Sequence, residues 1–185
     1  FVTYGLSADN DFYASDISYN EKGCASFLAH EGDTTIGQIT LSIPGEHNVQ
    51  NALAAIALCT QMKIPVTSII SGLSAFHGTK RRFEKKGTVG GITIIDDYAH
   101  HPDAYKVTLD TARSLGFKRV IAIHQPHTFS RTKMLMNEFV EVLSQFDHVI
   151  VTRIYAARET NDAYGVYAED VVARLDNAEY CPDYD

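Results

Sequence analysis

The chain has 185 residues, of which 45% are hydrophobic, and a formal net charge of −7 at pH 7. This length fits one large domain or two small ones, and the composition is that of a folded protein. The negative charge argues against a general nucleic-acid binder, so we expect no nucleic-acid partner. No apolar run approaches the roughly 20 residues that cross a bilayer, and no signal peptide is recognisable, so we expect no membrane partner.

The three cysteines, Cys24, Cys59 and Cys181, are widely spaced and form no CxxC motif. A disulfide framework is therefore not expected, and a reducing, cytoplasmic location is favoured. The chain opens inside strand-like sequence and stops after a short strand pattern. We therefore expect it to be a piece of a longer protein. The composition does not indicate an oligomeric state.

The first 43 residues have the pattern of an antiparallel β-meander. Strands are predicted at 12–18, 24–29 and 35–43, separated by turn-forming Asn, Gly and Asp. The last of them alternates apolar and polar residues, as a half-buried strand does. A helix is predicted from about His47 to Cys59, and a second short one from Pro65. This half is therefore mixed α/β.

Two asparagines at the start of the first predicted helix, Asn48 and Asn51, are three residues apart and share one helix face. Their amides offer a donor and an acceptor, which match the edge of an adenine. For Asn48 alone, spacing favours helix capping over adenine binding. That explanation leaves Asn51 unaccounted for, because Asn inside a helix is mildly unfavourable.

A change from helical to β-forming sequence marks a linker at about 78–80, next to three consecutive cations, Lys80, Arg81 and Arg82. Such a run is commonly a solvated face, but an Arg at a hinge can also reach a phosphate with its planar fork. We predict two domains, residues 1–79 and 80–185.

Alternating strands and helices follow the linker. A hairpin is predicted between 83–89 and 92–96 across Gly90 and Gly91. Helix 103–115 comes next, and further helices are predicted before and after the strand at 147–152. Strand 119–123 is continuously apolar, which predicts cover on both faces. This order predicts a Rossmann-like, mostly parallel sheet.

Polar loops follow two of these strands. Asp97, Tyr98, His100 and His101 come after the strand that ends at 96. In the other loop, after the strand that ends at Ile123, His127 and Arg131 are the candidate ligand-binding residues. If the two strands are neighbours, both loops share the rim where open α/β sheets bind ligands. The alternative is an ordinary turn, with His101 as helix cap and Pro102 at the first helical position.

Several familiar motifs are missing from the sequence. There is no HExxH or CxxC, so no metal site is predicted. There is also no GxxxxGK[ST] phosphate loop and no GxSxG nucleophile. We therefore assign no catalytic residue within this chain.

Four segments together resemble the Mur ligases: Gly45–Ala55, Arg81–Phe83, Asp96–Pro102 and Gln125–Arg131. Their order matches that family and they span most of the chain. The resemblance implies an ATP-dependent, amide-forming ligase of peptidoglycan synthesis with three domains. The chain would cover the later part of the central ATPase domain and much of the C-terminal Rossmann-like domain. The family's phosphate loop and metal ligands are absent from it.

The resemblance also implies site roles. His47, Asn48 and Asn51 would lie at the adenine of ATP, with Arg82 on the nucleotide and Asp97 on the ribose. Tyr98, His127 and Arg131 would receive L-alanine, which is joined to UDP-N-acetylmuramate through an acyl phosphate. ATP and Mg are the implied cofactors, with the Mg ligands outside this chain.

Two alternatives stay open: a paralogous ligase that attaches a recycled peptide to the same sugar nucleotide, and a non-catalytic nucleotide- or amino-acid-binding module. We expect the 185-residue chain alone not to catalyse.

Overall fold

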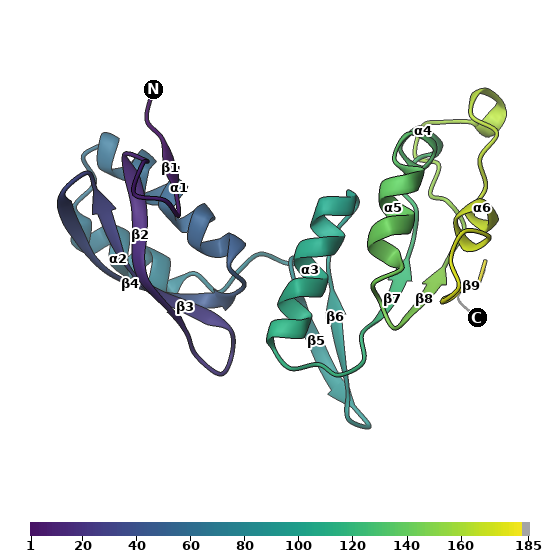
Figure 1. Cartoon of the computed structure of the whole chain (residues 1–185), viewed down its shortest axis with the longest axis horizontal. Coiled ribbons are helices and arrows are strands. Elements are labelled where there is room, and N and C mark those ends of the chain that lie inside the picture. The colour runs from purple at the N-terminus through teal and green to yellow at the C-terminus, as the bar shows by residue number, and fades with distance from the viewer. Residues whose placement is uncertain (183–185) are drawn as a thin grey trace. The chain divides into compact units, whose positions relative to one another are not determined.

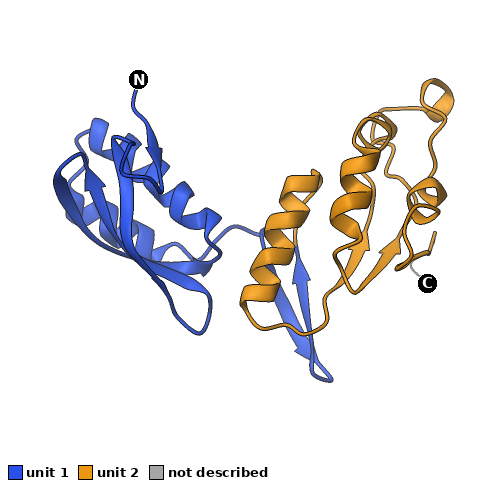
Figure 2. Ribbon diagram, viewed as in Figure 1, with its two compact units in different colours: residues 1–96 blue, residues 97–185 orange. Residues whose placement is uncertain are grey.

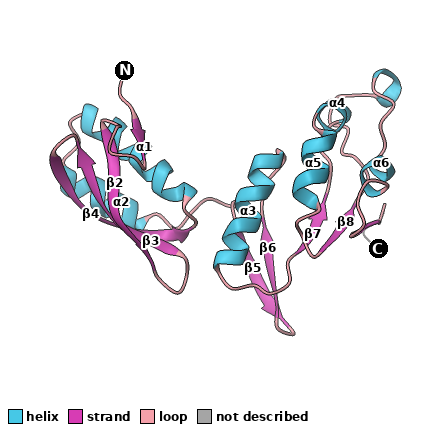
Figure 3. Ribbon diagram, in the orientation of Figure 1, coloured by secondary structure: helices cyan, strands magenta, loops and turns pink. Residues whose placement is uncertain are grey.

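A computed structural model describes residues 1–182 of the chain. The polypeptide divides into two compact units, residues 1–96 and 97–185 (Figure 2). Each unit combines strands with helices (Figure 3), which confirms the predicted α/β class. The predicted division into domains at 79 and 80 stays a prediction.

Unit 1 is built on a four-stranded sheet in the order β1-β2-β3-β4. The bounds are β1 Tyr4–Gly5, β2 Phe12–Tyr19, β3 Cys24–Glu31 and β4 Thr34–Pro44. Strands β2, β3 and β4 form the predicted antiparallel meander, and β1 adds a short parallel edge. Helices α1 (His47–Gln61) and α2 (Val66–Ala75) follow the sheet in the chain (Figure 1).

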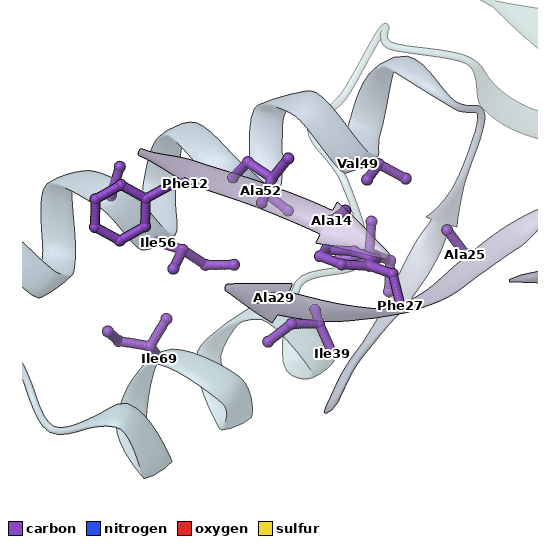
Figure 4. Packing of buried hydrophobic residues seen from close by; sticks show 13 residues of the cluster. Phe12, Ala14, Ala25, Phe27, Ala29, Ile39, Val49, Ala52, Ile56 and Ile69 are labelled. Carbon is purple, nitrogen blue, oxygen red and sulfur yellow. The ribbon is translucent and has the colours of Figure 1, made fainter. Parts of the chain in front are cut away.

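The core of unit 1 forms between the sheet and its two helices. Alternating residues of β2 to β4 point toward α1, whose buried side recurs every three or four residues. Figure 4 shows Phe27 and Ile39 from the strands near Val49, Ile56 and Ile69 from the helices. This packing fixes the start of α1, where the candidate nucleotide-binding residues Asn48 and Asn51 lie.

An antiparallel hairpin completes unit 1. Its strands are β5 (Glu84–Val89) and β6 (Ile92–Asp96), joined at Gly90 and Gly91, which both have positive φ. Only a residue without Cβ adopts these turn angles at low cost, so the glycine pair specified the turn. In the described part of the chain β6 pairs with β5 and not with β7, so the condition named for a shared rim, that the strands ending at 96 and 123 are sheet neighbours, is not met.

Unit 2 contains a three-stranded parallel sheet, β7-β8-β9, with the bounds Ile121–His124, His148–Val151 and Ala178–Tyr180. Its helices are α3 (Pro102–Ser114), α4 (Phe129–Met134), α5 (Met136–Leu143) and α6 (Ala168–Val172), with a 3-10 turn at Asn161–Ala163. The parallel strands with connecting helices agree with the predicted Rossmann-like order. A core of α3, α5, α6 and the sheet holds the unit together.

Strand β7 departs from the prediction. Its exposure alternates: Ala122 and His124 are buried, whereas Ile121 and Ile123 are 48% and 69% exposed. The expectation that this strand is covered on both faces was therefore wrong for the described residues. The physical reason is that the helices packed in the core of unit 2 contact only the face that carries Ala122.

Candidate functional site

The first candidate residues lie at the start of α1 in unit 1. The side chain of Asn48 donates from Nδ2 to the carbonyl of Pro44 at 2.7 Å, and Asn51 donates from Nδ2 to Oδ1 of Asn48 at 3.1 Å. Asn48 is not the N-cap, which is Glu46, so helix capping does not explain it. Asn51 is exposed and keeps an amide N–H and its oxygen for a ligand. His47 is the half-buried first residue of the same helix.

Arg82 lies exposed in the segment between α2 and β5. Its neighbours Arg81 and Phe83 both have positive φ, at 59° and 46°. Side chains with a Cβ rarely adopt such angles, so this segment is a sharply shaped turn rather than an extended strand. The charge of Arg82 is thus presented to solvent by a turn of defined shape.

The loop between β6 and α3 combines both interpretations of its sequence. His101 is the N-cap of α3 and accepts from the backbone N–H of Asp103 at 3.4 Å, with Pro102 at the first helical position. His100 donates from Nδ1 to the carbonyl of Tyr98 at 2.8 Å, because a carbonyl can only accept. In its neutral form His100 therefore presents Nε2 as an acceptor. The helix cap His101 and the candidate binding residue Tyr98 therefore lie in one loop.

Four aromatic rings of unit 2 form a row that joins three loops. Tyr98 and His100 have ring centroids 5.3 Å apart, and His100 and His127 are 6.3 Å apart. His127 stacks on Tyr155, at 5.4 Å and an interplanar angle of 30°. The row brings together Tyr98 and His127, which the sequence placed in separate loops. Tyr155, which lies on the loop after β8, was not singled out from the sequence.

Arg131 lies beside His127. Its Nη1 donates to Nδ1 of His127 at 3.2 Å and approaches the carbonyl of the same residue at 3.5 Å. A guanidinium can only donate, so Nδ1 is the acceptor and His127 carries its proton on Nε2. The pair thus presents a guanidinium and an imidazole N–H, which are both suited to a carboxylate.

Thr128, between them, has a strained backbone. Its φ of 70° and ψ of 146° are almost confined to glycine. Hydrogen bonds on both sides hold it there: its N–H donates to Tyr155 at 2.9 Å, and its carbonyl accepts from the hydroxyl of Thr132 at 2.7 Å. Its own hydroxyl caps α4 by accepting from the N–H of Arg131. Strain that is maintained in this way marks a site whose geometry matters.

Glu159 ties the loop after β8 to the beginning of α4. Its carboxylate accepts from the backbone N–H of Ser130 at 2.8 Å and from the hydroxyl of the same residue. The hydroxyl bond, followed by the backbone bond, lowers the pKa of Glu159, and Arg131 adds a smaller effect. A carboxylate thus holds the helix turn that carries Arg131.

Sequence reasoning missed one polar pair beneath this site. The hydroxyl of Tyr105 in α3 lies 2.6 Å from Nδ1 of His124, which is 1% exposed at the end of β7. Burial lowers the pKa of His124 to about 4, and burial with the charge of Asp97 raises the pKa of Tyr105. The sequence carried no signal for this pair, because the alternating burial of β7 is visible only in the structure.

Among residues 1–182, no group of three or more His, Cys, Asp or Glu side chains is arranged to hold a metal ion. In the same part of the chain, none of the helices combines the length and the apolar character needed to cross a bilayer.

Family comparisons agree with the motifs and the fold. Residues 1–59 match the Mur ligase middle domain, and residues 81–185 match the Mur ligase glutamate ligase domain. The chain belongs to the Mur ligase family, as its four motifs predicted.

Within that family, the chain is similar to proteins named UDP-N-acetylmuramate–L-alanine ligase. It is 46% identical over 188 residues to the one from Agathobacter rectalis, covering 100% of this chain and 41% of that relative. The one from Acetivibrio thermocellus is 42% identical, with 100% and 40% covered. The chain thus spans about two fifths of the length of these relatives.

Solved structures of Mur ligases have a fold similar to that of this chain. The UDP-N-acetylmuramate–alanine ligase of Thermotoga maritima superposes with a TM-score of 0.75 at 27% identity, over 98% of this chain and 39% of that one. A murein peptide ligase of Psychrobacter arcticus superposes with a TM-score of 0.68, also at 27% identity, over 98% and 38%.

Proposed function

We propose that this chain forms the adenine-side and amino-acid-binding parts of an ATP-dependent ligase that joins L-alanine to UDP-N-acetylmuramate in the cytoplasm. The observation that carries the proposal is the convergence of Tyr98, His127 and Arg131 in unit 2. The relatives named above carry this activity in their names. The complete enzyme, its substrates and its location are part of the proposal.

The amino-acid side follows from the donors and acceptors of the ring row. Arg131 and the Nε2–H of His127 would hold the carboxylate of L-alanine. The amine would then lie toward His100, whose Nε2 accepts in the neutral form. Fixing the amino acid at both ends directs its amine toward an activated acyl carbon, which contributes by orientation.

Each unit offers its own candidate residues for the nucleotide. In unit 1, Asn51 and its partner Asn48 offer amide groups to an adenine, beside His47, and Arg82 offers a cation to phosphate. In unit 2, Asp97 offers a carboxylate to ribose hydroxyls. ATP would supply the phosphoryl group that activates the sugar-nucleotide carboxylate as an acyl phosphate.

The Mg²⁺ that accompanies ATP is assigned no ligand here. The described residues include no group of three or more His, Cys, Asp or Glu side chains that could hold it. Its ligands are expected in the part of the relatives' length that this chain does not span. For the same reason we propose that the 185-residue chain alone does not catalyse the ligase reaction.

The test uses a complete ligase that contains this chain. Amide formation is measured with L-alanine, ATP and UDP-N-acetylmuramate, in the wild type, Arg131→Ala and Asp97→Ala. We expect Arg131→Ala to raise the KM for L-alanine and Asp97→Ala to raise the KM for ATP, each by about tenfold or more, the loss expected for a hydrogen bond to a charged group. Unchanged values in both variants would show that the site is wrongly assigned.

A peptide-adding ligase is the second candidate, favoured by the structural likeness to the murein peptide ligase. Assaying the complete enzyme with L-alanine against a tripeptide separates the two. Preference for the tripeptide would select the alternative. Binding of ADP and L-alanine without turnover would select a non-catalytic module.

A further inference from the structure

A buried hydrogen bond joins the two parts of unit 2 that carry the proposed amino-acid site. Tyr105 lies in the first turn of α3, and His124 ends β7. The phenol oxygen lies 2.6 Å from Nδ1, and the two rings meet edge to face, 5.2 Å apart at 82°. Phe139 of α5 packs against both rings, at 6.0 Å and 5.3 Å. The contact is therefore enclosed and shielded from water.

The protons of this pair can be assigned. Burial keeps the phenol protonated by raising the pKa of Tyr105, and it keeps the imidazole neutral by lowering that of His124 to about 4. The hydroxyl therefore donates to Nδ1, and the proton of the imidazole is on Nε2. That Nε2 has no hydrogen-bond partner among the described residues. An unpaired buried donor is costly, so this histidine is not explained by stability.

The chain on either side of the pair leads directly to the candidate site. Three residues after His124 comes His127, and the backbone carbonyl of His124 is held by the N–H of Thr152 at 2.9 Å. On the other side, the N–H of Tyr105 donates to the carbonyl of His101 at 3.2 Å, at the end of the loop that carries Tyr98. The pair is thus connected to both loops by a few backbone atoms.

We propose that Tyr105 and His124 are positioning residues: their hydrogen bond fixes the loop of Tyr98 and His100 against the loop of His127 and Arg131, and so sets the affinity for the amino acid. The inference deepens the proposed function and rests on it for the identity of the ligand. The row of rings depends on the spacing between the two loops. A change of that spacing separates His100 from His127 and weakens binding at both ends of the amino acid.

Three variants of a complete ligase test the proposal. Tyr105→Phe removes only the hydroxyl, His124→Phe removes the imidazole, and the double variant replaces the polar pair by an apolar one. Tyr180→Phe is the matched control, since this ring packs against the same core from β9. We expect Tyr105→Phe to raise the KM for L-alanine about fivefold, the effect of losing one hydrogen bond. The KM for UDP-N-acetylmuramate should stay unchanged in all four proteins.

The double variant separates positioning from packing. Replacing both partners removes the unpaired donor, so its thermal stability should recover to the wild-type value or above. Positioning predicts that the KM for L-alanine nevertheless stays raised about fivefold. If the KM recovers together with the stability, the pair is only part of the core and the proposal is overturned.

A spectroscopic measurement does not depend on turnover. In the complete protein, the 15N and 1H NMR signals of the imidazoles should show His124 protonated on Nε2. The His127 signals should shift in Tyr105→Phe and not in Tyr180→Phe. If L-alanine is not a substrate but these shifts occur, the proposed function fails while the positioning holds. If the His127 signals do not respond, the positioning fails whatever the substrate is.

Discussion

Burial of His124 makes the stability of unit 2 depend on pH in a range where carboxylates change little. The pKa of this imidazole falls from 6.5 to about 4, because burial penalises its charged form. The unfolded chain therefore binds a proton at a higher pH than the folded one. The free energy of unfolding of unit 2 is therefore unaffected by this group above pH 6.5 and decreases as the pH falls from 6.5 toward 4.

The size of the effect follows from this shift. Each pH unit between the two pKa values changes the free energy of unfolding by about 1.4 kcal/mol. Between pH 6.5 and pH 5 the loss is therefore about 2 kcal/mol. Asp147 and Glu159, whose pKa values are lowered by hydrogen bonds, act below about pH 4.5, outside this window.

Amide hydrogen exchange of Val149 and Val151 measures the stability of unit 2, since both lie in the buried strand β8. We expect the exchange free energy of the wild type to fall by about 2 kcal/mol from pH 6.5 to pH 5. In His124→Phe that slope should disappear, whatever the change in absolute stability. The control His77→Gln removes an exposed imidazole and should keep the slope. An equal slope in wild type and His124→Phe would refute the reasoning.

Three further predictions concern the site and the core. In a complete ligase, Arg131→Lys keeps the charge but loses the planar fork, so the KM for L-alanine should rise about tenfold, and an unchanged KM would contradict carboxylate binding there. Glu159→Gln should raise the KM for L-alanine about fivefold by loosening the turn at Ser130, whereas the exposed control Glu141→Gln should leave it unchanged. The stabilisation of the folded state by Glu159 is present above its ordinary pKa of 4.5, and it should be lost as the pH falls through its lowered pKa. Phe27→Ala should destabilise unit 1 by about 3–5 kcal/mol, measured by exchange of the β2 and β3 amides, because the ring is fully buried; the exposed Tyr19→Ala should cost less than about 1 kcal/mol, and equal losses would contradict the core assignment.

Features encoded by neighbouring residues were predictable from the sequence. The hairpin at Gly90 and Gly91 depends on local backbone freedom. The start of α3 depends on the capping side chain of His101 and on the proline ring of Pro102. The alternation of β4 likewise predicted its buried side. In each case the determining interaction spans only a few residues.

Features that depend on distant segments were not predictable. The exposed face of β7 is decided by which helices reach it, and the residues of the strand look equally apolar on both faces. Tyr105 and His124 are 19 residues apart, and nothing local distinguishes this histidine from its neighbours. The approach of His100 to His127 was anticipated only through a sheet pairing that the structure does not contain.

The strained backbone at Thr128 has a consequence for engineering this protein. Glycine would relax its φ of 70°, so a laboratory selection for thermal stability alone should enrich glycine at this position. The same substitution removes the hydroxyl that caps α4 next to Arg131. A more heat-resistant protein obtained in this way would have a looser turn beside Arg131 in the proposed amino-acid site, so selections should score stability and substrate affinity together.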